Sequence, residues 1–257
     1  MAQFKSKNFT YNNVKFYEYG FYFCSVGGSA SSVLGTQRSV SNTNGFIQVD
    51  YSCPSFRLQI IKLDKENNIL PLTDKDIRFL KVNLLLKQPA PLISEDNTGI
   101  VYYGVFKNIT LNNTRTRGYL DVDFEMTEPH AYTSVRHFYV RNTSSTNATR
   151  TNIMCEDEID KYYPDFIIEV IENGSVTITN HTTNEEMVLN NLVKGEKIHV
   201  YGDRVFQMVN ETAPDKNVYT NSNGKFISLK YGKNIVSLKG HARVDIACQF
   251  RIGIETL

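Results

Sequence analysis

The sequence lacks tryptophan altogether, and its cysteines form no closely spaced pair. Without tryptophan the chain has no indole ring, the largest aromatic platform on which a sugar could stack. The cysteines are single residues separated by long stretches, which is typical of free thiols in a reducing compartment. A disulfide framework or a zinc site is the alternative. These residues are Cys24, Cys53, Cys155 and Cys248.

Long apolar runs and a strong net charge are also missing. The longest apolar-rich stretch, DFIIEVI at 165–171, has the length of a strand, whereas a membrane span needs about 18 apolar residues. The opening residues, MAQFKSKNFTYNN, contain no apolar segment typical of a secretion signal. The net charge of +1 gives no indication of a nucleic-acid or anionic-membrane partner. We therefore expect no secretion leader and no membrane insertion.

No catalytic motif with a specific pattern occurs in the sequence. There is no GxSxG elbow, Walker loop, GxGxxG after a strand or HExxH pair. Only His130 and His137 are close together, and the six residues between them do not match a zinc-site spacing. Asp121 and Asp123 lie on the same face of one predicted strand. For these two carboxylates, a solvated strand face is favoured over a catalytic acid–base pair. We expect a chain that is not an enzyme, with no metal and no cofactor.

Strand-forming residues are what the sequence has in abundance. Its 15 Phe and 15 Tyr, together with many β-branched residues, favour sheet over helix. From 166 onward, short alternating stretches are separated by turn signals such as Asn173-Gly174. This punctuation is typical of a β-sandwich. The predicted fold class is mainly β, with an N-terminal β-rich domain that holds one α-helix and a C-terminal β-sandwich.

One segment, at about 73–88, has the pattern of a helix. Thr73 is a suitable N-cap, and Asp74 and Asp76 in the first turn complement the helix dipole. Apolar residues then recur at helical spacing until prolines end the pattern, so the helix is expected to pack on a sheet. The apolar residues are Ile77, Leu80, Val82, Leu84, Leu85 and Leu86, and the prolines are Pro89 and Pro91.

Composition divides the chain into three parts. Residues 142–164 are polar, small and charged, which is typical of a linker or a long loop. The division predicts an N-terminal domain at 1–141 and a β-sandwich at 165–257. Within the first domain, the Gly- and Ser-rich stretch 27–45 is longer than most loops of compact domains. Loops of this length usually have a function. This stretch predicts a long loop or an irregular β-arm.

Near the end of the chain, GKFISLKYGKNIVSLKG at 224–240 predicts a hairpin. Ile227 and Leu229 alternate with polar residues, which gives one buried face. Gly232 supplies the turn, with a positive φ. We expect this hairpin to close the sandwich and to hold no ligand.

The order of these elements resembles the distal tail protein family of long-tailed siphophages, the hub of the tail tip or baseplate. FTYNNVKFYEYGFYF is similar to the family's opening strands. LTDKDIRFLKVNLLLKQPAPLISEDNTGIVYYGVFKNI is similar to its helix, Pro/Leu-rich turn and strand with paired tyrosines. GYLDVDFEMTEPHAYT resembles the strand that closes the first domain. The strands of the family's galectin-like sandwich resemble FIIEVIENGSVTITN, GEKIHVYGD and FISLKYGKNIVSLKG.

The resemblance implies a structural role at the distal end of the virion tail, for a protein made in the host bacterial cytoplasm. Family members form a ring, usually a homohexamer, through their N-terminal domains, with the galectin-like domains outside. The implied partners are other copies of the chain, the tail tube protein, a tail-tip protein of the tail-associated lysin type and a receptor-binding protein. DNA passes through as cargo. We expect 27–45 to contact the tube or a neighbouring copy.

Two other functions remain open at this point. A carbohydrate-binding or adhesion module would recognise host cell-wall glycan, with Tyr162, Tyr163 and Tyr201 as its glycan-binding residues. Core or interface positions are favoured for these tyrosines. A small hydrolase on a β scaffold would need a catalytic residue set that the sequence does not show.

Overall fold

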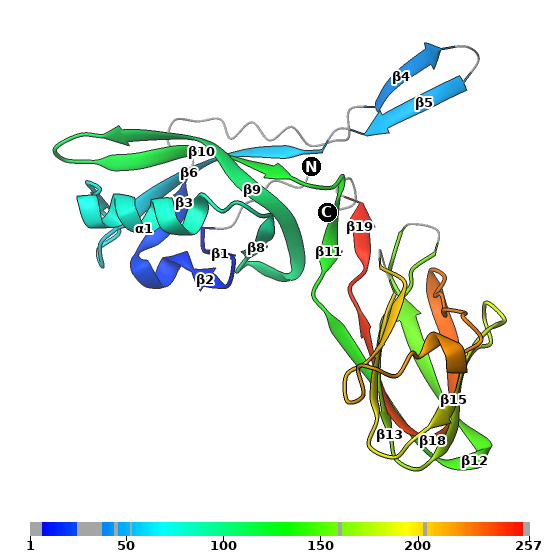
Figure 1. The fold of residues 1–257 in the computed structure, drawn as a ribbon. Helices are drawn as coiled ribbons and strands as arrows, with labels where there is room; N and C mark the ends of the chain where they lie inside the picture. The colour runs from blue at the N-terminus through cyan, green and yellow to red at the C-terminus, as the bar shows by residue number, and fades with distance from the viewer. Residues whose placement is uncertain are drawn as a thin grey trace. The chain divides into compact units, whose positions relative to one another are not determined.

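The computed structural model forms two compact units, residues 1–134 with 252–257 and residues 135–251 (Figure 1). Each unit is built on antiparallel strands. For strands 38–43 and 46–51 the structure describes the backbone and its pairing but not the side chains. The described stretches are 7–24, 38–43, 46–51, 53–158, 161–202 and 205–253.

The first unit contains a sheet with the strand order β2-β1-β8-β9-β10-β6-β3, and β7, β11 and β19 pair at its sides. Strand β10 alternates between buried and half-buried residues, as its sequence predicts. On the half-buried face, Asp121 accepts hydrogen bonds from Gln59 and Asn112, and Asp123 accepts one from Asn108. The strands are β1 (Phe9–Tyr11), β2 (Val14–Lys15), β3 (Phe21–Cys24), β6 (Ser55–Leu63), β7 (Ile69–Leu70), β8 (Ala90–Ser94), β9 (Asn97–Asn113), β10 (Gly118–Met126), β11 (His130–Thr133) and β19 (Arg251–Gly253).

Aromatic side chains fill the core of this unit. Phe9 stacks between Phe16 and Phe23, with ring centroids 4.6 and 3.7 Å away. The hydroxyl of the buried Tyr11 donates to the carbonyl of Gly104 at 3.2 Å. Burial disfavours the tyrosinate and raises the pKa of Tyr11 to about 12. Burying rings of this size is the main stabilising contribution of such a core.

Helix α1 (Asp74–Leu84) is capped as the sequence predicts but ends earlier. The Thr73 hydroxyl accepts from the Asp76 amide, and the Asp76 carboxylate accepts from the Thr73 amide, which forms a capping box. In a continued helix Leu86 would lie about 200° around the axis from Leu84, yet both pack against the same core. The helix therefore stops after Leu84.

The apolar stripe of α1 is also narrower than predicted. Val82 is 72% exposed and Leu85 is 49% exposed, whereas Leu80 and Leu84 are buried. The stripe thus covers one side of the helix. Among the residues that the structure describes, α1 is the one α-helix, and its 11 residues are too few to cross a membrane.

Two strands pair only with each other within the described part of the chain. β4 (Arg38–Thr43) and β5 (Phe46–Tyr51) form an antiparallel two-stranded sheet. The predicted arm at 27–45 is therefore described at 38–43, as a strand. Residues 27–37 and 44–45 lie outside the described residues.

The second unit is one antiparallel sheet with the order β15-β14-β18-β13-β16-β17, and β12 pairs with β18. β12 and β18 pair over almost their whole length, with a register shift between Ser144 and Ala148 that falls opposite Gly240. The buried Asn142 amide donates to the carbonyls of Ser144 and Asn147, each at 2.9 Å, and fixes this irregularity. The strands are β12 (Arg136–Cys155), β13 (Asp165–Val170), β14 (Gly174–Asn180), β15 (Glu185–Leu192), β16 (Lys197–Tyr201), β17 (Gln207–Asn210) and β18 (Gly232–Cys248).

The long strands divide this sheet into two layers around one core. β14 pairs with the first half of β18, and β13 pairs with its second half. Buried side chains from both halves belong to a single cluster, including Phe166, Ile178, Leu238 and Ile246. A sandwich core thus arises from one continuous sheet. The predicted fold class, mainly β with one helix in the first domain, is confirmed.

The predicted linker at 142–164 is wrong over much of its length. Residues 142–155 belong to β12, and the two units divide between Ser134 and Val135. The second unit consequently begins before the predicted sandwich at 165–257, and it ends at Arg251. The composition suggested a linker because this part of β12 buries few side chains. Small polar residues therefore take the place of the alternating apolar and polar residues that are typical of a strand.

The predicted hairpin at 224–240 is also wrong in its first arm. Residues 226–230 make a single bridge, between Leu229 and Tyr162, and β18 begins after them. The backbone amide and hydroxyl of Ser228 donate instead to the Glu185 carboxylate, at 2.7 and 2.6 Å. Side chains therefore satisfy backbone groups that a strand partner would otherwise bind. Leu229 is buried, as predicted.

Candidate functional site

The outward face of β12, β18, β13 and β16 carries charged and aromatic side chains around a groove of about 380 Å³. Strand residues alternate between faces, so each outward residue follows one that enters the core. We call this depression the outer groove. Its outward-facing lining residues are Tyr139, Arg141, Ile167, Glu169, Lys197, Arg243 and Asp245.

Strand register places four charges in one row across the outer groove. Arg141 on β12 lies opposite Arg243 on β18. Arg243 in turn lies opposite Glu169 on β13, and Glu169 lies opposite Lys197 on β16. Side chains directly opposite in adjacent strands have Cβ atoms about 5 Å apart. The row therefore juxtaposes two guanidinium groups at one end.

Several neighbouring side chains on this face already have a partner. His137 Nδ1 lies 3.0 Å from the Asp245 carboxylate, and Lys197 Nζ lies 2.8 Å from the Glu211 carboxylate. The Lys197–Glu211 hydrogen bond lowers the pKa of Glu211 and raises that of Lys197. By contrast, Arg141, Arg243 and Glu169 make no side-chain hydrogen bond or ion pair with any residue that the structure describes.

An exposed aromatic ring lies beside Arg141 and Arg243, the two arginines that lie opposite each other in the β12–β18 ladder. Tyr139 is 75% exposed, and it precedes Arg141 by two residues on the same face of β12. The His137 ring lies nearly parallel to the Tyr139 ring, with centroids 6.1 Å apart. Within the described residues β12 pairs only with β18, so this ring lies at a sheet edge. Most of its surface is available to a ligand.

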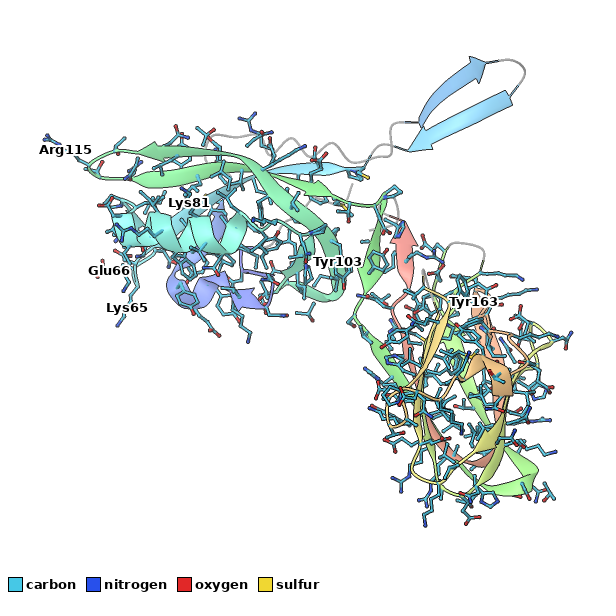
Figure 2. All side chains as sticks on the ribbon, in the orientation of Figure 1. Lys65, Glu66, Lys81, Tyr103, Arg115 and Tyr163 are labelled. Carbon is cyan, nitrogen blue, oxygen red and sulfur yellow. The ribbon has the colours of Figure 1, made fainter. Side chains whose placement is uncertain are left out.

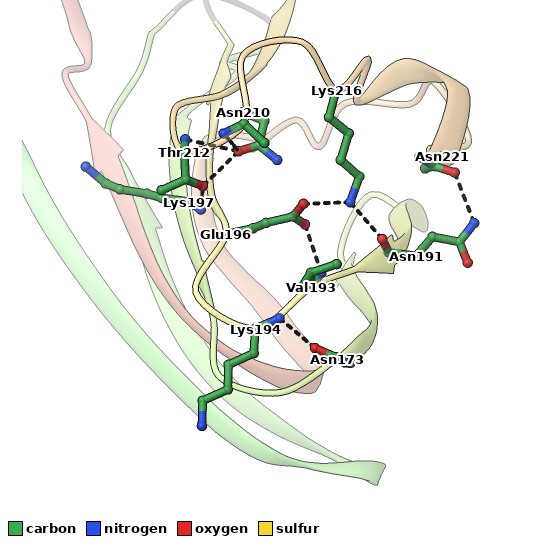
Figure 3. A network of polar contacts seen from close by, with 11 residues as sticks. Asn173, Asn191, Val193, Lys194, Glu196, Lys197, Asn210, Thr212, Lys216 and Asn221 are labelled. Atoms are coloured by element: carbon green, nitrogen blue, oxygen red, sulfur yellow. Dashed lines mark hydrogen bonds and ion pairs between the residues drawn. The ribbon is translucent and has the colours of Figure 1, made fainter.

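A buried carboxylate fixes the start of β16, next to Lys197 (Figure 3). Glu196 accepts hydrogen bonds from Lys216 Nζ at 2.7 Å and from the Val193 amide at 2.9 Å. Lys216 Nζ also donates to the Asn191 carbonyl at 2.8 Å. Burial opposes ionisation of Glu196, but the bonds from Lys216 and Val193 outweigh it and lower the pKa. The network ties the loop around Lys216 to β16.

The structure separates the three tyrosines predicted from the sequence. Tyr162 is buried, and its hydroxyl accepts from the Gln249 amide at 2.8 Å, so its ring is closed to a ligand. Tyr163, labelled in Figure 2, packs edge-on against Phe206. Tyr201 points outward from β16 and stacks on His199. They do not form one platform, although Tyr201 lies on the same sheet face as the outer groove.

Sequence reasoning did not find the residues of the outer groove. Arg141 and Arg243 are far apart in the chain, and only the β12–β18 register makes them neighbours. The one available signal was the alternation of Tyr139 and Arg141 with Val140 in a stretch assigned to a domain end.

The cysteines and the acidic groups suggest no reactive centre in the described residues. All four cysteines are free thiols, and Cys155 and Cys248 are buried. Burial raises the pKa of Cys155 to about 11 and raises that of Cys248 as well, which suppresses the nucleophilic thiolate. Within the same residues, no group of three or more His, Cys, Asp or Glu side chains is placed to hold a metal ion.

Two family models match the chain, one after the other. A model described as a phage tail protein N-terminal domain matches residues 4–128, and one described as a phage tail C-terminal domain matches residues 130–248. Together they cover nearly the whole sequence. The chain therefore belongs to the phage tail proteins built from these two domains. A search of curated protein sequences finds no match.

Among solved structures, the chain is similar to SPP1 Dit (gp 19.1), described as a paradigm of the hub adsorption apparatus in phages that infect Gram-positive bacteria. The TM-score is 0.59 at 13% sequence identity, over 95% of this chain and 98% of that one. The resemblance to siphophage distal tail proteins drawn from the sequence is thereby confirmed. The chain is a structural protein of a phage tail, located in the virion tail and associated with other tail components.

Proposed function

We propose that this protein is the hub at the distal end of a long phage tail. It joins the tail tube to the tail-tip protein and the receptor-binding apparatus, and it lets DNA pass through a central lumen. The observation that carries the proposal is the combination of both tail-domain matches with a hub fold along 95% of the chain. The role is one of assembly without catalysis, for a protein made in the host bacterial cytoplasm.

The hub is a homohexameric ring formed by the N-terminal units, with the galectin-like second units outside. A closed ring requires a heterologous interface, in which one surface of each copy fits a different surface of the next. The segment 27–45 supplies part of that contact, to a neighbouring copy or to the tube. Its described portion, β4, pairs only with β5 among the described residues, and an isolated two-stranded sheet is marginally stable in water without further packing.

The mass of the purified protein in solution tests this proposal, with negative-stain images of the same sample. Six copies of 29.4 kDa have a mass of about 176 kDa, and the expected result is a ring of that mass with a central hole. A chain that stays monomeric both alone and when mixed with the tail tube protein of the same phage would overturn the ring.

Recognition of host cell-wall glycan is the second candidate function. It is supported by aromatic side chains that point outward in the second unit. Of the three tyrosines predicted from the sequence, Tyr163 and Tyr201 remain partly exposed. A glycan array with the intact chain tests this function separately from assembly.

A further inference from the structure

An unfavourable charge arrangement marks the outer groove. Arg141 and Arg243 lie directly opposite each other in the β12–β18 ladder, and like charges in such positions destabilise a sheet. Glu169 flanks Arg243 on its other side. Arg141 lies on β12, which pairs with no second strand among the described residues, so no cross-strand carboxylate compensates it. Local conflicts of this kind in a stable fold point to function.

The other carboxylates of the face do not resolve the conflict. Asp245 is engaged by His137 at 3.0 Å, and Glu211 is engaged by Lys197 at 2.8 Å. Glu169 is shared in register between Arg243 and Lys197. In this row the Arg141 side chain therefore faces a second guanidinium group and no carboxylate.

We propose that the outer groove binds an anionic glycan. Its carboxylate or phosphate lies between the guanidinium groups of Arg141 and Arg243, and a sugar ring stacks on Tyr139. A guanidinium binds such oxyanions through two parallel hydrogen bonds. Residues two apart on a strand are about 7 Å apart, so an acidic group and the ring that carries it can reach both Arg141 and Tyr139. The Glu169 carboxylate accepts a hydrogen bond from a sugar hydroxyl.

The dimensions of the site favour a glycan over an acidic protein. The groove of about 380 Å³ falls within the range of roughly 300–1,000 Å³ typical of small-ligand sites. A stable protein interface would instead bury about 800 Å² on each partner, mostly outside this groove. This proposal rests on the glycan-recognition function proposed above and names its ligand class. The site uses residues of the second unit alone, so it does not depend on formation of the ring.

Binding of defined probes to the full chain, measured by calorimetry, tests the proposal. The probes are a glucuronate-containing tetrasaccharide, a glycerol-phosphate polymer, a neutral glucose tetrasaccharide and polyglutamate. We expect one or both anionic glycan probes to bind, and whichever binds more tightly identifies the carboxylate or the phosphate as the preferred group. Affinity should fall as salt rises from about 0.05 to 0.5 M, because the arginines are exposed.

Variants of the arginines and the tyrosine locate the binding. The double variant Arg141→Gln/Arg243→Gln should weaken binding by at least about tenfold, since hydrogen bonds to charged groups are lost. Tyr139→Ser should weaken it by about threefold to tenfold. Arg150→Gln is the matched control, because Arg150 is an exposed arginine on β12 beyond the register shift. It should leave the affinity unchanged, and thermal unfolding confirms that each variant is folded.

Several outcomes would overturn the proposal. These are unchanged affinity in the double arginine variant, equal binding of the neutral tetrasaccharide, and no binding of any probe. Tighter binding of polyglutamate than of both anionic glycans would replace the glycan with an acidic protein partner.

Discussion

A Cβ atom on Gly240 would lie 2.2 Å from the carbonyl oxygen of Ser175. Gly240 has a φ of +104° and lies opposite Ser144, where the register of the β12–β18 ladder shifts. The backbone near the start of β14 therefore approaches β18 so closely that no side chain fits at Gly240. The close packing of β14 on β18 at this point therefore requires a residue without a side chain.

Replacing Gly240 with alanine should destabilise the second unit severely. The positive φ costs about 1–2 kcal/mol for a residue with a Cβ, and displacing a packed backbone adds about 1–3 kcal/mol. Thermal or denaturant unfolding of the Gly240→Ala variant measures the sum. Gly232→Ala is the matched control, because Gly232 also has a positive φ, +91°, but nothing lies within 4 Å of its Cβ position. Equal losses in the two variants would show that the close approach is unimportant.

Asp76 should stabilise the first unit at neutral pH, and this contribution should be lost in acid. Burial opposes ionisation of its carboxyl, but hydrogen bonds from Lys62 and Thr73 outweigh this and lower the pKa. A lowered folded-state pKa gives stability that is fully present above the unfolded value, about 3.9, and lost as pH falls through the folded value. Asp76→Asn should therefore cost about 1–2 kcal/mol at pH 7, and the cost should shrink towards pH 3.

The control for Asp76 is Asp74→Asn, in the same helical turn but exposed. It should cost only a few tenths of a kcal/mol, through the helix dipole. A loss for Asp76→Asn that stays constant between pH 7 and pH 3 would contradict the capping and ion-pair account.

Lys216 should stabilise the second unit by neutralising the Glu196 carboxylate. Lys216→Met leaves that carboxylate buried without its cation, so we expect a loss of about 2 kcal/mol at pH 7. Because the Glu196 pKa is lowered in the folded protein, the contribution is lost as pH falls below about 4.3, the ordinary Glu value. Denaturant unfolding at pH 7 and pH 3 measures both effects. Lys194→Met, an exposed neighbour (Figure 3), should be neutral, and an equal loss there would refute the pairing.

Deletion of residues 27–45 should leave the protein folded but unable to assemble. The deletion removes β4, which pairs only with β5 among the described residues, and touches neither core cluster as described. Circular dichroism and the unfolding midpoint should change little, whereas light scattering should show loss of the ring. A Gly/Ser replacement of equal length should also fail to assemble. Intact rings from either variant would rule out a role for this segment in assembly.

Where local chemistry decides the structure, the sequence predicted it well. Thr73 caps α1 as predicted. The turn between β1 and β2 likewise follows from adjacent residues, because Asn12 and Asn13 both have positive φ, 49° and 63°. Asparagine tolerates this conformation because its short side chain can hydrogen-bond locally. These features depend on a few adjacent residues, so a single sequence contains the required information.

Elements that depend on distant partners were mispredicted. Residues 142–155 form a strand because β18 pairs with them, although their composition is that of a loop. The alternating residues 226–230 fail to form one because Glu185 and Asn234 side chains bind their amides. The outer groove escaped detection for the same reason, since only tertiary register brings Arg141 beside Arg243.

The pairing of β12 with β18 also constrains how the second unit can fold during synthesis. β12 is the first strand of its sheet to be made, and within the described residues its one partner is the last, since Arg136 pairs with Cys248 and Cys155 with Gly232. Non-local pairing of this kind is slow to form. A nascent chain that stopped before Gly232 would expose both edges of a long strand, which is a template for aggregation.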